Sequence, residues 1–332
     1  MRNMLIKLLS KIYNTIKSTT YFKNLYYAVS NSNYFSNLQE HEKMLNDKTR
    51  INTYYQAIQK YVNSGDIVID LGAGTGILSF MASKKLPKKI FAVEHSKIIE
   101  SAKIVACHNA ITNIEFVNRN SKDFGTTEKA DIIIHEQIGA LLFDEKMVEN
   151  VLDLRDRVLK KDGKILHGKF DFFVEPVQIT DAGKVPFIWE QNIHGIRFDC
   201  LNSHKKDING VYGMLLIKPD AIKQFVSVPE KILYFDMESM EKESIPKKFK
   251  YRRNVLKDCE LNGLIVYFNA IFDEEIILTT SPIARTTRAW SIPLLRTEPI
   301  NFKEGDIIEI DFEMGDPSDI NTYKWNCVRK NS

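Results

Sequence analysis

The sequence predicts an α/β protein with a doubly wound parallel sheet, a mainly antiparallel β-barrel domain and an N-terminal helical segment. Three observations predict this. Between residues 61 and 168, short apolar runs alternate with helix-length segments, a rhythm typical of parallel sheets covered by helices. A glycine-rich loop directly follows the first apolar run. After residue 168, β-type runs succeed one another with few helical segments between them, which favours a barrel or sandwich.

Residues 1–60 form the predicted helical segment, because apolar residues recur there at intervals of three to four. Residues 4–13 combine apolar and basic side chains at helical spacing, and Lys7 and Lys11 interrupt the apolar run that a signal peptide needs. A helix lying on a membrane surface is one alternative. We expect instead that this helix packs on the catalytic domain or on a partner subunit.

The strands are expected at apolar runs, and the domains follow from where the rhythm changes. The parallel strands are predicted at 67–69, 90–93, 114–117 and 132–134, with helices near 77–86 and 97–110, in a domain of residues 61–168. The β domain, residues 169–332, is predicted to contain strands at 170–174, 211–217, 264–268 and 307–312.

Composition narrows the class of protein. A chain of 332 residues is long enough for two domains. A net charge of +3 is nearly balanced, so we expect no nucleic-acid partner. The four cysteines form no Cys-x-x-Cys pair, which argues against a zinc site and a disulfide framework. Free thiols are typical of the reducing cytoplasm, where we expect this protein.

The loop from Asp70 to Gly76 is the first candidate binding site. Ligands of parallel sheets bind beyond the carboxyl ends of the strands, and Gly72 and Gly74 let the backbone approach a ligand closely. Glu94 ends the next predicted strand, where a carboxylate accepts both hydroxyls of a ribose. Ile77 occupies the position where a dinucleotide-binding loop has a small residue. The loop therefore suits a nucleoside cofactor without a pyrophosphate.

Two carboxylates form the second candidate site. Glu136 directly follows the fourth predicted parallel strand, and Glu145 is expected to begin a helix that carries Met147. If the intervening chain turns back, both carboxylates face one pocket and suit a guanidinium, which pairs bidentately with carboxylates. One of them is also available to take a proton. The alternative is that Glu145 is only an acidic residue at a helix N-terminus.

These motifs resemble the protein arginine N-methyltransferases, a family of class I S-adenosylmethionine-dependent enzymes with a Rossmann-like sheet. The resemblance runs from about residue 34 to about residue 311. It rests on Tyr34-Phe35, on the His-x-x-Met-Leu-x-Asp-x-x-Arg pattern of residues 41–50, on the glycine loop in 68–79, on Glu136 and Glu145, and on the helix 151–159. The β half matches more loosely, at 189–195, 267–270 and 280–282.

The resemblance implies roles for individual residues. It implies S-adenosyl-L-methionine as cofactor, S-adenosyl-L-homocysteine as product and no metal. The acceptor would be arginine in a protein or peptide, or a free guanidino compound such as arginine. A homodimer would form through an arm near 188–215. The implied catalytic residues are Glu136 and Glu145; the cofactor-binding residues are His41, Arg50, Asp70, Gly72, Gly74, Glu94, Ser121 and Asp123; the substrate-side residues are Tyr34, Met44, Asp47, Met147, Arg288 and Trp290.

The chain departs from the family pattern on the substrate side. Leu38 stands where a tyrosine is usual, and Gln137 and Ala140 replace two aromatic residues beside Glu136. Ala289 replaces the histidine that pairs in the family with the aspartate matched here by Asp47. We therefore expect Asp47 to pair with Arg285 or Arg288, or to be solvated. Cofactor binding is expected to be kept while the choice of substrate has changed.

Two other functions remain open from the sequence. One is a methyltransferase of the same fold that acts on another small nucleophile. The other is a non-catalytic scaffold that retains the fold. Retention of both Glu136 and Glu145 counts against the scaffold, because a protein without catalysis has little use for two facing carboxylates.

Overall fold

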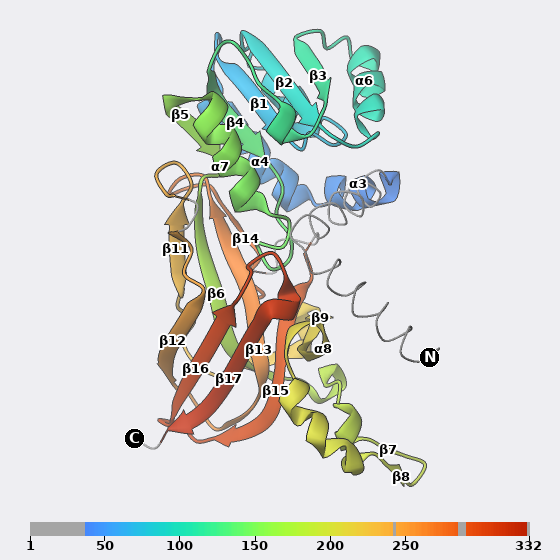
Figure 1. Ribbon diagram of the computed structural model, residues 1–332, viewed down its shortest axis with the longest axis vertical. Helices are drawn as coiled ribbons and strands as arrows, with labels where there is room; N and C mark the ends of the chain where they lie inside the picture. Colours follow the sequence, from blue (N-terminus) through green and yellow to red (C-terminus); the bar gives the residue numbers. More distant parts are fainter. Residues whose placement is uncertain (1–36, 242–243, 285–289, 331–332) are drawn as a thin grey trace, which may run out of the picture.

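The computed structural model describes residues 37–241, 244–284 and 290–330. A parallel sheet flanked by helices forms one end of the molecule, a larger antiparallel β structure follows below it, and an arm projects at the far end (Figure 1). The predicted fold class is confirmed. The predicted helix at 4–13, Tyr34, Arg285 and Arg288 lie outside the described residues.

The parallel sheet has the strand order β3-β2-β1-β4-β5. The order reverses between β1 and β4, and such a switch point opens a ligand crevice at the carboxyl ends of the two strands. All five residues of β1 are buried, as expected for a strand covered on both faces. The strands are β1 (Ile67–Leu71), β2 (Lys89–Glu94), β3 (Ile114–Asn118), β4 (Ala130–His135) and β5 (Leu159–Leu166).

Helices flank this sheet and lead into it. Helix α4 buries Tyr54, Ala57 and Ile58, which recur at the three- and four-residue spacing of an amphipathic helix. The Asp47 side chain caps α4 by accepting a hydrogen bond from the Arg50 backbone N–H at 3.2 Å. The helices are α3 (Leu38–Leu45), α4 (Lys48–Tyr61), α5 (Ile77–Ser83), α6 (Ile99–His108) and α7 (Met147–Val158).

The β domain is built on two antiparallel sheets. The larger has the order β10-β6-β13-β15-β9, with β11 paired to β6 and β14 paired to β13; the smaller is β12-β16-β17. Their inner faces form a common apolar core. The strands are β6 (Lys169–Ile179), β9 (Met214–Ile217), β10 (Ile222–Phe225), β11 (Leu233–Asp236), β12 (Lys248–Asn254), β13 (Cys259–Ile271), β14 (Ile277–Thr279), β15 (Ile292–Phe302), β16 (Ile307–Met314) and β17 (Tyr323–Lys330).

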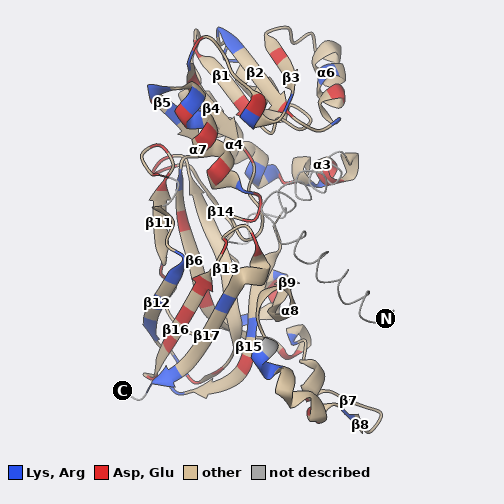
Figure 2. Cartoon of the chain, in the orientation of Figure 1, with Lys and Arg blue, Asp and Glu red and all other residues tan. Residues whose placement is uncertain are grey.

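The outer face of the smaller sheet carries both signs of charge. The charged residues of β12 are basic and those of the neighbouring β16 are acidic (Figure 2). Glu309 pairs with Lys250 at 3.1 Å and with Arg252 at 2.8 Å. These charges therefore neutralise one another across the strands rather than forming a patch of one sign.

Two predictions about local structure were wrong in detail. Residues 211–213 were expected to be part of a strand, but they belong to helix α8 (Gly210–Gly213), which precedes β9. A side chain at Gly213 would come within 2.4 Å of the Trp325 ring, so close packing of this turn requires glycine. Glu145 was expected to begin a helix, but α7 begins at Met147 after Lys146 in a left-handed conformation.

Direct contacts join the parallel sheet to the β domain. The Tyr61 hydroxyl at the end of α4 donates to Asp273 Oδ2 at 2.5 Å. Lys60 also pairs with Asp273, at 2.8 Å. From α7, Arg155 donates to the carbonyl oxygens of Met237 and Met240 at 2.7 and 2.8 Å. Polar contacts from two helices thus fix the orientation of the two parts.

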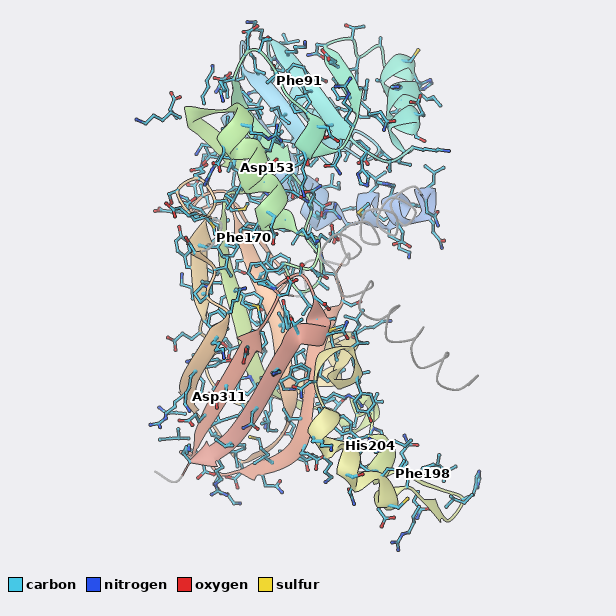
Figure 3. The ribbon with its side chains drawn as sticks, viewed as in Figure 1. Phe91, Asp153, Phe170, Phe198, His204 and Asp311 are labelled. Atoms are coloured by element: carbon cyan, nitrogen blue, oxygen red, sulfur yellow. The ribbon has the colours of Figure 1, made fainter. Side chains whose placement is uncertain are left out.

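The arm projects from the end of the β domain opposite the parallel sheet; Phe198 and His204 mark it in Figure 3. It consists of η3 (Ile188–Glu190), the hairpin β7 (Asn192–Ile193) and β8 (Ile196–Arg197), and η4 (Asp199–Asp207). Its base is fixed to the β domain by Trp189 Nε1, which donates to Glu298 at 3.1 Å, and by the Arg296 guanidinium, which lies 4.1 Å from the centre of the Phe187 ring. Among the described residues, no helix is long and apolar enough to cross a membrane.

Candidate active site

The glycine loop leaves β1 at the switch point, and three of its positions require glycine. Gly72, Gly74 and Gly76 all have positive φ angles, of 75°, 54° and 86°, which other residues adopt at a cost. A Cβ at Gly74 would come within 2.8 Å of the His41 ring, and one at Gly72 within 3.2 Å of the Gln137 side chain. His41, from α3, and Gln137, which follows β4, therefore both pack against the loop.

Two buried carboxylates stiffen this loop. Asp70 Oδ2 accepts hydrogen bonds from Ser79 N–H at 2.9 Å and from the Ser79 hydroxyl at 2.6 Å, which ties β1 to helix α5. Glu94 accepts from Gly74 N–H at 3.1 Å and from Ser96 N–H at 2.7 Å. Burial raises the pKa of Asp70 to about 6. Asp70 thus supports the loop, while Glu94 lies beside the backbone of Gly74.

Ser121 and Asp123 lie in a short turn, η1 (Ser121–Asp123), beyond β3. Arg157 of α7 holds this turn by donating to the Ser121 carbonyl at 2.8 Å and to the Phe124 carbonyl. The Asp123 side chain is exposed. The turn is therefore fixed at its base while Asp123 stays accessible to a ligand.

Arg50 links the glycine-loop side to the carboxylates. Its guanidinium forms a buried ion pair with Glu136 and lies 5.3 Å from the centre of the Trp290 ring. It also contacts Met44 Sδ at 3.6 Å. Asp47 is only 2 % exposed, so the alternative of a solvated Asp47 is wrong.

Glu136 and Glu145 lie at the end of β4 and before α7, in surroundings that disfavour negative charge. Burial raises the pKa of Glu136 to about 7, although the charge of Arg50 opposes this shift. Burial also raises the pKa of Glu145 to about 8, and the nearby charges of Glu136 and Asp144 add to the effect. A further cation beside this pair would reduce both the repulsion and the cost of burying negative charge.

The segment between these glutamates is closely packed. Trp290 Nε1 donates to the Ile138 carbonyl at 2.8 Å. A Cβ at Gly139 would come within 2.0 Å of Asp144 Oδ1, so the hairpin closes tightly on itself. Met147 is fully buried behind it. Side-chain contacts from Trp290, Asp144 and Met147 therefore fix the segment that joins the two carboxylates.

The structure thus brings together most of the predicted site residues that it describes. His41, Gly72, Gly74 and Glu94 surround the loop, and Met44, Asp47, Arg50 and Trp290 lie on the side of Glu136. The sequence analysis missed Ser79, which holds Asp70, and the buried residues Tyr54, His135 and His167, which contact one another beneath Glu136. The histidine directly after the apolar run 132–134, His135 at the end of β4, was the available signal for this cluster.

The residue types present at the site fit S-adenosylmethionine in chemistry. The glycine loop carries no Cβ at three positions, the Glu94 carboxylate lies against Gly74, and the cation Arg50 lies beside Glu136. Among the described residues, no group of His, Cys, Asp and Glu is arranged to hold a metal ion.

Comparisons with known proteins find similarity to methyltransferases. A family model described as a methyltransferase domain matches residues 62–210. Protein arginine N-methyltransferase 6 of Danio rerio is 27% identical, over 89% of this chain and 86% of that protein. A probable histone-arginine methyltransferase 1.3 of Arabidopsis thaliana is 29% identical, over 83% of this chain and 53% of that longer protein.

Solved structures agree with the fold. The enzyme-prozyme heterotetrameric complex of Trypanosoma brucei PRMT1 with AdoHcy has a TM-score of 0.75 and 22% identity, and the match covers 90% of this chain and 99% of that chain. Protein arginine methyltransferase 10 of Arabidopsis thaliana also has a TM-score of 0.75, with 23% identity, 90% of this chain and 94% of that chain covered.

Proposed function

Because this chain is a methyltransferase related over most of its length to the protein arginine N-methyltransferases, we propose that it methylates a guanidino nitrogen of arginine. The carrying observation is the pair of enclosed carboxylates, Glu136 and Glu145, at the switch point of the parallel sheet. The domain boundaries at residues 61 and 169 and the roles below are part of the same proposal.

We assign cofactor binding to the glycine-loop side of the crevice. Gly72 and Gly74 would contact the cofactor, Glu94 would bind its ribose hydroxyls, and Arg50 would hold its carboxylate. His41, Asp70, Ser121 and Asp123 complete this side, with Asp70 acting through Ser79 and the loop. When bound, S-adenosylmethionine supplies an electrophilic methyl group.

The two glutamates bind and orient the acceptor. Their oxygens accept hydrogen bonds from the N–H groups of a guanidinium. These bonds localise the positive charge of the guanidinium on the bound nitrogens and leave the reacting nitrogen more nucleophilic. The carboxylate with the higher pKa, Glu145, is suited to receive the departing proton. Alignment of the reacting groups and electrostatic stabilisation are then the main contributions of the protein.

The acceptor side of the site, which departs from the family pattern, determines the class of substrate. Met44, Asp47, Met147 and Trp290 lie near the acceptor, and we propose that Tyr34 and Arg288 complete this side. Gln137 lies over the glycine loop where the family has an aromatic residue. An arginine in a protein, an arginine in a peptide and free arginine all present the required guanidinium; another small nucleophile is the competing acceptor.

Glu145→Gln tests the assignment, with Glu149→Gln as a matched control in the first turn of α7. We expect Glu145→Gln to bind S-adenosylhomocysteine like the native protein, measured by calorimetry, while methyl transfer to arginine falls at least about 100-fold. Glu149→Gln should leave both unchanged. Unchanged transfer in Glu145→Gln would show that the carboxylate pair is misassigned.

We also propose a homodimer formed through the arm. The arm exposes the apolar side chains Ile193 and Ile196, which are 47% and 65% accessible, and such exposed clusters mark interaction surfaces. The arm lies opposite the parallel sheet, as a head-to-tail arrangement requires (Figure 1). Light scattering should give a dimer at micromolar concentration, and Ile196→Asp should give a monomer; a native monomer would contradict the proposal.

A cytoplasmic location completes the proposal. The described cysteines are free thiols, and Cys107 and Cys200 are exposed, a state that a reducing compartment preserves. Localisation of the tagged full-length chain by microscopy tests this directly.

A further inference from the structure

We propose that Tyr54, His135 and His167 form a closed ring of hydrogen bonds that positions the peptide bond leading into Glu136. The three side chains come from helix α4, from the end of β4 and from the turn between β5 and β6. All three are fully buried. The inference rests on the role proposed above for Glu136.

The direction of each hydrogen bond follows from the chemistry of the groups. A carbonyl oxygen only accepts, so the Tyr54 hydroxyl donates its proton to the His135 carbonyl, at 2.9 Å. Since that proton is used, the Tyr54 oxygen accepts from His167 Nε2, 2.6 Å away. His135 Nε2 in turn donates to the His167 carbonyl at 3.1 Å. The ring is thereby closed, with both histidines protonated on Nε2.

The ring has no place for a further proton. Among the described residues, Nδ1 of His135 and Nδ1 of His167 are buried without a hydrogen-bond partner. Burial lowers the pKa of His135 to about 4 and that of His167 well below its ordinary value. Both imidazoles therefore stay neutral while Glu136 titrates, and the ring remains a fixed scaffold.

The position of the ring connects it to the chemistry. The carbonyl that Tyr54 holds belongs to the peptide bond whose nitrogen is that of Glu136. Arg50, one helical turn before Tyr54 on α4, pairs with the Glu136 side chain. Helix α4 therefore contacts Glu136 in two ways: Tyr54 binds the peptide bond before it, and Arg50 binds its carboxylate.

Aromatic side chains of the β domain enclose the ring. The Phe272 ring makes edge contacts with Tyr54 and His167, at 5.3 and 5.1 Å between centroids. Phe170 contacts His167 at 5.1 Å and lies at the end of β6 nearest the parallel sheet (Figure 3). Displacement of the ring members is thus restricted from both parts of the protein.

Tyr54→Phe removes the hydroxyl and keeps the aromatic ring. Tyr251→Phe is the matched control, because Tyr251 also donates to a backbone carbonyl, that of Val174 at 2.6 Å, but within the β domain. We expect Tyr54→Phe to lower kcat about 10- to 100-fold and to shift the acid limb of the pH profile of kcat/KM upward by about 0.5 pH unit or more, because Glu136 loses its alignment with Arg50. Tyr251→Phe should leave the midpoint of the profile unchanged.

A pair of variants at His167 separates hydrogen bonding from packing. His167→Gln retains an N–H group within reach of the Tyr54 oxygen, whereas His167→Leu fills the space without a donor. We expect the glutamine variant to keep the native pH midpoint and the leucine variant to show the Tyr54→Phe shift. Equal midpoints in the two variants would contradict a role for the His167 donor.

Titration of the Glu136 carboxyl by ¹³C NMR, assigned with Glu136→Gln, gives a readout without turnover. An altered Glu136 titration in Tyr54→Phe supports the ring, and a native titration together with a native pH profile overturns it, whatever the loss of thermal stability. A native protein that methylates no guanidino acceptor would refute the proposed function, while this titration would still decide the role of the ring.

Discussion

The carboxylates on the two sides of the crevice differ in the groups that surround them. On the glycine-loop side, Asp70 and Glu94 each accept two short hydrogen bonds from neighbouring groups. On the other side, Glu145 is enclosed with Glu136 and Asp144, and their charges raise its pKa further. On the first side, donors of the fold itself bind both carboxylates, whereas on the second side Glu136 pairs with Arg50 and a further cation would offset the repulsion between the carboxylates.

This difference separates structural from functional constraint. A carboxylate held by backbone N–H groups contributes to stability and orders the loop before any ligand binds. A pair of enclosed carboxylates opposes folding unless a positive charge neutralises it. A guanidinium that binds beside Glu136 and Glu145 should therefore stabilise the folded protein.

Of the three tests that follow, the largest effect is expected from a substitution in the glycine loop. Gly74→Ala places a Cβ 2.8 Å from the His41 ring at a φ of 54°, so the loop and His41 must both move. We expect the affinity for S-adenosylhomocysteine, measured by calorimetry, to fall by more than about 10-fold. Gly305→Ala is the control, since Gly305 has a φ of 83° with nothing within 4 Å, and its binding should match the native protein.

A native affinity in Gly74→Ala would mean that the cofactor does not approach this loop.

The pH dependence of kcat/KM tests the ionisation of the carboxylates on the acceptor side. Because burial raises the pKa of Glu136 to about 7 and of Glu145 to about 8, much of the free enzyme carries protonated carboxyls below neutrality. A cationic acceptor needs them ionised, so kcat/KM for arginine should rise between pH 6 and pH 8.5 and then level off. The initial rate at limiting acceptor concentration measures this; a flat profile would contradict the raised pKa values.

The smallest expected effect concerns stability. The pKa of Glu145 is raised in the folded state, so its contribution to stability is present below the ordinary glutamate pKa and is lost as the pH rises through about 8. Glu145→Gln removes this loss. The variant should therefore have a Tm at least about 2 °C above the native protein at pH 8, with little difference at pH 5, as thermal unfolding will report. A lower Tm at pH 8 would mean that Glu145 stabilises the free protein.

The sequence predicted the arrangement of the parallel sheet well, because each feature there is local. The alternation of strands and helices and the glycine loop depend on neighbouring residues, and the loop is found where the strand order reverses. The contacts of the acceptor side join residues far apart in the chain, such as Trp290 with Ile138 and Arg50 with Glu136. No spacing rule predicts such pairs.

The errors have the same origin. Residues 211–213 carry a β-type pattern, but their packing on Trp325 turns them into a helix. His135 lies in a strand that the sequence marks as apolar, and only the tertiary structure brings Tyr54 and His167 to its polar atoms. Polar groups buried by distant elements are thus the part of this site that the sequence alone does not reveal.

The most direct test of the account is methyl transfer from labelled S-adenosylmethionine to an arginine-containing peptide, to free arginine and to a lysine-containing peptide, with products identified by mass spectrometry. The account predicts methylated arginine from at least one of the first two acceptors, its loss in Glu145→Gln, and no product from the lysine peptide. Transfer to a non-guanidino acceptor alone would contradict it.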